Sequence, residues 1–137
     1  RVINTSSSLY QKKPSKFDVK LRKVGTPGAS PTIGAKIINS AGVIKYTSPT
    51  TIDPSTLTTS LETKTFDFST NTYEMQTGDK IFIEYDGTSE TDYVRAGVRP
   101  NDDSSEADGT NSTLSYHDGS SWFNSASRDL ACTIYEA

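Results

Sequence analysis

The sequence has few of the residues on which disulfides and many active sites depend. Its 137 residues include one cysteine, one histidine, one methionine and one tryptophan. A single cysteine excludes an internal disulfide. Cys132 could serve as a nucleophile only with His117, which lies in a different segment beside a turn. We therefore expect Cys132 to act as a small hydrophobic residue facing a core.

Long apolar runs and an excess of basic charge are also missing. No apolar stretch approaches 18 residues, so we expect no membrane insertion. Acidic side chains outnumber basic ones, 17 to 14, and the pI is near 5.1, which argues against a nucleic-acid partner. The chain starts at Arg1 with no charged and apolar leader. We expect a domain that was excised or processed out of a larger protein.

Helix signals are nearly absent, and strand signals take their place. Only the segment from Asp53 to Leu57, with an acid before a proline, supports one helical turn. In contrast, Leu130, Cys132 and Ile134 alternate with smaller or polar neighbours, which is the period-two pattern of a strand with one buried face. The 19 serines and 19 threonines suit the exposed faces of such strands.

The same alternation predicts about nine strands, over residues 16–24, 33–39, 42–47, 63–68, 80–85, 92–99, 111–116, 121–123 and 129–136. Without crossover helices, parallel βαβ units are excluded, and the strands must close as a sandwich or barrel. The loops 49–61 and 87–92 are long enough to cross between two sheets. We predict one all-β domain over residues 1–137, a jelly-roll β-sandwich of two antiparallel sheets with eight or nine strands.

The predicted core is formed by the apolar residues that alternate within these strands: Phe17, Val19, Leu21, Ile37, Phe66, Ile81, Ile83, Val94, Val98, Leu130 and Ile134. The polar partners on the first strand include Lys16, Lys20 and Arg22, which we interpret as the solvated face of an amphipathic strand.

Several turn and core motifs follow one another in a recognisable order, among them Gly25-Thr-Pro27, Asp53-Pro-Ser-Thr-Leu57, Thr77-Gly-Asp79, Asp108-Gly-Thr-Asn111 and Ser121-Trp122. This order resembles the jelly-roll β-sandwich modules, similar to carbohydrate-binding modules, of archaeal, bacterial and phage surface or secreted proteins. The resemblance covers almost the whole chain. It implies an extracellular or cell-surface location, attachment or recognition that often involves carbohydrate, and in some members a structural Ca²⁺.

An acidic loop over residues 101–109 is the candidate metal site. Asp102, Asp103 and Asp108 lie in it among Asn and Ser side chains, and Ca²⁺ takes six to eight such oxygen ligands. The loop does not match the EF-hand pattern, because Ser115 stands where a glutamate is required. The alternative is an acidic loop that is simply solvated.

Aromatic and basic residues supply the candidate ligand site. Within 92–99, the alternation places Tyr93, Arg95 and Arg99 on the face opposite the apolar residues, and Tyr116 and Trp122 lie at a neighbouring hairpin end. Sugar rings stack on flat aromatic side chains, and adjacent polar groups bind their hydroxyls. The alternatives are an ordinary solvated sheet face and, for Trp122, a place in the core.

Catalytic patterns are weak by comparison. Glu62, Glu84, Glu90 and Asp92 could pair as a glycosidase requires, but a domain with 17 acids brings carboxylates together by chance. We therefore predict a non-catalytic extracellular binding module, with carbohydrate as the expected partner. The alternative is a structural spacer or self-association module of a cell-surface or phage assembly.

Removing Ca²⁺ tests the acidic loop. If Asp102, Asp103 and Asp108 bind the ion only in the folded state, a hundredfold excess of Ca²⁺ over Kd stabilises the fold by about 2.7 kcal/mol. EDTA should then lower the melting temperature, and Asp103→Asn should abolish that response. An unchanged melt in EDTA, with no Ca²⁺ uptake in calorimetry, would show that the loop is merely acidic.

Overall fold

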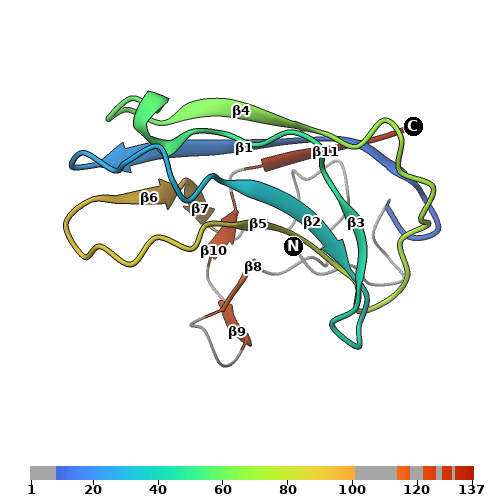
Figure 1. The fold of residues 1–137 in the computed structure, drawn as a ribbon. Coiled ribbons are helices and arrows are strands. Elements are labelled where there is room, and N and C mark those ends of the chain that lie inside the picture. Colours follow the sequence, from blue (N-terminus) through green and yellow to red (C-terminus); the bar gives the residue numbers. More distant parts are fainter. Residues whose placement is uncertain (1–8, 101–113, 118–121, 126–127, 131) are drawn as a thin grey trace.

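The computed structural model describes residues 9–100, 114–117, 122–125, 128–130 and 132–137, and gives only the backbone course of 98–100, 114–117, 122–125 and 128–130. The regular structure of these residues is almost entirely β-strand, and the two larger sheets are antiparallel (Figure 1). The one helical element within them is a single 3-10 turn, η1 (Pro54–Thr56), capped by the Asp53 side chain on the Ser55 N–H. This confirms the predicted all-β class and the predicted helical turn.

The first sheet is organised around its longest strand, β1 (Pro14–Val24). On one edge β1 pairs with β4 (Glu62–Asp67). On its other edge it pairs with β11 (Cys132–Glu136) along its first half and with β6 (Tyr93–Ala96) along its second half. The β11 pairing reaches Val19 and the β6 pairing begins at Leu21. One edge of β1 is therefore shared by two strands from distant parts of the chain.

The second sheet has the order β3-β2-β5, formed by β2 (Gly34–Ile38), β3 (Ile44–Thr47) and β5 (Lys80–Glu84). The Asn39 side chain closes the β2–β3 hairpin, because its Oδ1 accepts the N–H groups of Ala41 and Val43 at 3.1 and 2.8 Å. Gly42 supplies the left-handed backbone of this turn, with φ of 81°. The turn thus fixes the register of β3 on β2.

Two short pairs complete the described strands: β7 (Val98–Pro100) with β10 (Arg128–Leu130), and β8 (Leu114–His117) with β9 (Trp122–Ser125). The predicted strand 92–99 is therefore two strands, β6 and β7, separated at Gly97. The Gly97 N–H donates to the Lys20 carbonyl at 2.8 Å, and the chain then leaves β1 to pair with β10. The chain cannot continue along β1 after Gly97, because β11 already pairs with that edge of β1 from Val19 back to Pro14.

The core lies between the two larger sheets. Phe17 stacks with Phe66 and Phe68 at centroid distances of 6.2 and 6.3 Å. Of the predicted core residues, Phe17, Val19, Leu21, Ile37, Phe66 and Ile81 are buried, whereas Ile83, Val94 and Ile134 are partly buried against that core. The side chains of Val98 and Leu130 lie outside the described residues. The register predicted for β1, β4 and β5 is thus confirmed.

A buried carboxylate joins the hairpin turn to the segment before β5. Asp79 is 1% exposed, and its Oδ2 accepts the Tyr73 hydroxyl and the Gln76 N–H, each at 2.7 Å. Its Oδ1 accepts the Ser40 N–H at 3.2 Å. Burial first, and then the hydrogen bond and charge of Asp79, raise the pKa of Tyr73 from 10.0 to about 12.

The raised pKa means that the folded state favours the protonated phenol. The stability that the protonated Tyr73 hydroxyl contributes is complete below pH 10 and is lost as the pH rises through about 12. Tyr73 and Asp79 therefore form a neutral donor and a charged acceptor that depend on each other.

Replacing Asp79 with Asn tests this network. The amide would present N–H donors to groups that are themselves donors, and a buried unsatisfied donor costs about 1–3 kcal/mol of unfolding free energy. A titration of tyrosinate absorbance should show the Tyr73 pKa falling from about 12. The exposed Asp86→Asn is the matched control, with an expected change within about 0.5 kcal/mol. Equal stability of both variants would contradict the proposed network.

Candidate functional site

The outer face of the four-stranded sheet carries a mixed set of cations, aromatic rings and hydroxyls. Because Phe17, Val19 and Leu21 point into the core, the alternate side chains of β1 point away from it. Register carries the same alternation onto the neighbouring strands. We call the resulting surface the outer sheet face; it comprises Lys16, Asp18, Lys20, Arg22, Thr63, Thr65, Asp67, Tyr93, Arg95, Thr133 and Tyr135.

One end of the outer sheet face contains the two predicted ligand residues that the structure places. Arg95 is exposed, while Val94 and Ala96 are partly buried against the core, which confirms the predicted alternation of β6. The Arg95 Nη2 donates to the Tyr93 hydroxyl at 3.3 Å, and its guanidinium carbon lies 5.8 Å from the centre of the Tyr93 ring. Arg95 stands directly opposite Arg22 across the β1–β6 pair. This end therefore combines an aromatic ring with two guanidinium groups.

The other end holds a second aromatic ring and cation. The Lys16 Nζ lies 3.8 Å from the centre of the Tyr135 ring, and 3.3 Å from Asp18 Oδ2. Asp18 Oδ1 also accepts the Thr65 hydroxyl at 2.6 Å. The Tyr135 side chain is 41% exposed. The Tyr135 ring is thus in contact with Lys16 and still partly open to solvent.

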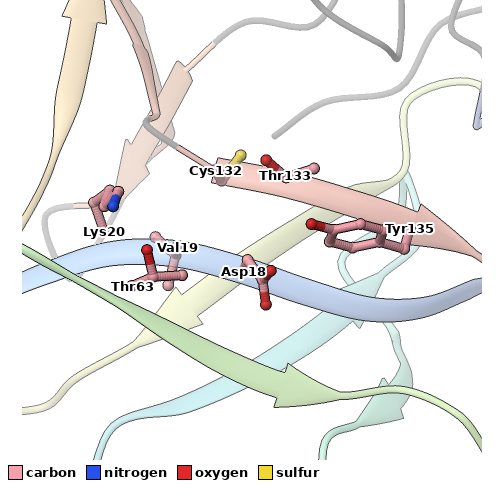
Figure 2. Close-up of a pocket in the computed structure, with 7 residues that line it drawn as sticks. All are labelled: Asp18, Val19, Lys20, Thr63, Cys132, Thr133 and Tyr135. Atoms are coloured by element: carbon pink, nitrogen blue, oxygen red, sulfur yellow. The ribbon is translucent and has the colours of Figure 1, made fainter.

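An open depression of about 310 Å³ lies at the middle of this face. Figure 2 shows its lining on three adjacent strands, β11, β1 and β4, and the residues are Asp18, Val19, Lys20, Thr63, Cys132, Thr133 and Tyr135. The depression includes Lys20, which lies between the part of β1 that pairs with β11 and the part that pairs with β6. Cys132 is partly buried and packs against the core, in keeping with its predicted role as a small hydrophobic residue.

Three of the four carboxylates considered for hydrolysis have structural partners. Glu62 accepts the Thr58 N–H at 2.9 Å, which is the main cause of its lowered pKa. Asp92 accepts the Thr26 N–H at 2.6 Å, and this bond, followed by the Thr91 hydroxyl, lowers its pKa. Glu84 pairs with Lys36. Each of these three carboxylates therefore has a structural partner, on different segments of the fold.

The remaining predicted site residues are located only in part. Arg99 lies on β7, Tyr116 on β8 opposite Phe123, and Trp122 on β9 opposite His117, but their side chains lie outside the described residues. The metal candidates Asp102, Asp103 and Asp108 also lie outside them. Within the described ranges, no group of three or more His, Cys, Asp or Glu side chains is placed to hold a metal. The Ca²⁺ site therefore stays a prediction.

Sequence reasoning did not assign a binding role to most of this face. It interpreted Lys16, Lys20 and Arg22 as ordinary solvated positions, and it did not single out Tyr135. The alternation in β1 identifies the face itself. The neighbours of β1 could not be found in this way, because they come from residues 93–96 and 132–136.

Comparison with known proteins identified no relative of this chain. No family model matches the chain, and neither curated proteins nor solved structures give a significant match. In the described part of the chain, no helix has the length and apolarity needed to cross a membrane.

The Arg22–Arg95 pair gives a prediction about stability. Like charges directly opposite each other in an antiparallel pair are unfavourable. Arg95→Gln should therefore leave the unfolding free energy unchanged or raise it by up to about 1 kcal/mol, as measured by chemical denaturation. Lys36→Gln, which breaks an ion pair on the other sheet, should show no such gain. A clear loss of stability in Arg95→Gln would mean that Arg95 holds β6 to β1.

Proposed function

We propose that this domain is a non-catalytic extracellular binding module that recognises carbohydrate through the outer sheet face. The observation that supports this most strongly is the pair of aromatic side chains, Tyr93 and Tyr135, each held by a neighbouring cation on a hydrogen-bonded sheet. A sugar ring presents C–H groups that stack on such rings. Rigid placement lowers the entropy that binding would otherwise cost.

The polar groups between the two rings suit sugar hydroxyls. The Asp18 carboxylate accepts hydrogen bonds, Lys20 donates them, and the hydroxyls of Thr63 and Thr133 can do either. All four line the same open depression. An open and shallow site is suited to a segment of a long polysaccharide, because such a chain can enter and leave along the sheet.

The finer assignment of the fold belongs to the same proposal. The two antiparallel sheets and the buried core between them support a jelly-roll sandwich, and the order of turn motifs resembles the modules of surface and secreted proteins. On this basis we propose a location outside the cell or on its surface, a role in adhesion, and a structural Ca²⁺ bound by Asp102, Asp103 and Asp108.

One feature favours the alternative, a structural or self-association module. Val43 and Ile44, at the tip of the β2–β3 hairpin, are 53% and 54% exposed. Ile44 is the first residue of β3, which is an edge strand in the described sheet, and Val43 precedes it. Exposed apolar side chains beside a free strand edge can pack against a second copy.

Aromatic truncation tests the carbohydrate proposal. Tyr93→Ala and Tyr135→Ala should each weaken binding to glycans captured on an array by about tenfold, because aromatic anchors often contribute 1–2 kcal/mol or more. The matched control is Phe82→Ala, an aromatic on β5 in the other sheet, which should bind as the unmodified protein does. If the array shows no binding with or without Ca²⁺, while sedimentation shows self-association that Val43→Ser removes, the alternative is correct.

A further inference from the structure

The charge of the outer sheet face differs from that of the whole protein. The chain has a net charge of −3, yet this face carries the four cations Lys16, Lys20, Arg22 and Arg95 against the two carboxylates of Asp18 and Asp67. Both carboxylates lie on the part of β1 and β4 near β11, since Asp67 pairs with Lys16. Positive charge is therefore concentrated at the β6 end of the face.

Within the described part of the chain, the cations at this end lack acidic partners. Among the described residues, no carboxylate forms an ion pair with Lys20, Arg22 or Arg95. To other described residues, Arg22 makes one long hydrogen bond, 3.5 Å from its Nη1 to the Thr59 carbonyl, and Arg95 makes one, from its Nη2 to the Tyr93 hydroxyl. A guanidinium has five N–H donors. Both arginines therefore retain most of their donors for a ligand.

Register brings these positive charges together. Arg22 and Arg95 are directly opposed, so their Cβ atoms lie about 5 Å apart, and Lys20 is on the same face two residues along β1. Such a like-charge pair disfavours folding, and an anion between the two groups would relieve it. Guanidinium groups bind planar carboxylates through two parallel hydrogen bonds.

We propose that the outer sheet face binds polysaccharides whose sugars carry carboxylates, that is, uronic acids. This inference rests on the proposed carbohydrate-binding function. Arg22 and Arg95 hold one ligand carboxylate between them, Lys20 binds a second anionic or hydroxyl group, and Tyr93 stacks on the sugar ring. The depression beside Lys20 takes the next sugar along the chain.

The composition of the face distinguishes this ligand from more densely charged polymers. Asp18 lies within the depression, where it would repel a polymer with several sulfates or phosphates per unit. The threonine hydroxyls and two tyrosine rings match a ligand that carries at most one carboxylate per sugar and is otherwise neutral. The negative net charge of the protein further disfavours a nucleic acid.

The test compares carboxylated polysaccharides with their uncharged forms. Polygalacturonate, alginate and hyaluronate fragments of matched length, the same fragments with their carboxyls reduced to alcohols, and heparin fragments are titrated into the protein by calorimetry. At least one uronate fragment should bind about tenfold or more tightly than its reduced form. Its affinity should fall as salt is raised, because exposed charge pairs are screened.

A double variant locates the site. Arg22→Gln with Arg95→Gln should lower the affinity for that uronate fragment about tenfold more than it lowers the affinity for the reduced form, because only the uronate fragment loses charge pairs, each of which contributes modestly. The control is Lys45→Gln with Lys80→Gln, which removes the same charge from the other sheet and should bind as the unmodified protein does. Melting curves confirm that both variants fold.

The outcomes separate this inference from the function on which it rests. Equal binding of uronate and reduced fragments overturns the inference but keeps carbohydrate binding. Tighter binding of heparin than of every uronate fragment overturns the choice of carboxylate, and an unaffected Arg22/Arg95 variant overturns the location. If no fragment of either kind binds, the inference fails, and the proposed function fails with it when the glycan array also shows no binding.

Discussion

The fold and the candidate site both depend on how the strands around β1 share its edges. β4 takes one edge, while β11 and β6 divide the other at Lys20. This division ends β6 at Ala96. After Gly97 the chain forms β7, which pairs with β10 instead of β1. The same division also brings aromatic and basic residues from three separate segments onto one surface. The site is therefore a consequence of pairing geometry.

The features predicted correctly from the sequence are those that local periodicity encodes, namely strands and their buried faces. Alternation identified β1, β4 and β5 and assigned Phe17, Phe66 and Ile81 to the core, because burial on one face of a strand leaves a period-two pattern. It did not predict the break at Gly97, which follows from competition between β6 and β11 for one edge. The opposition of Arg22 and Arg95 was equally hidden, since each looks like an ordinary exposed position in its own strand.

The polar groups of the molecule fall into two kinds. Asp79 is buried, and its two oxygens accept three hydrogen bonds, so its charge is used inside the protein. Lys20, Arg22 and Arg95 stand on the outer sheet face and have few partners among the described residues. A buried group such as Asp79 stabilises the fold but cannot contact a ligand. The exposed cations reduce stability and remain available to a ligand.

The pairing of β1 with β11 also affects the order in which the domain can fold. The Ser15 hydroxyl donates to the Glu136 carbonyl, a contact that spans 121 positions of the sequence. During synthesis from the N-terminus, the edge of β1 that β11 covers stays open while the intervening residues are made. An unpaired edge can associate with other chains, and contacts so distant slow folding. We therefore expect β11 to complete this sheet late and, once paired, to cover an edge that could otherwise associate with other chains.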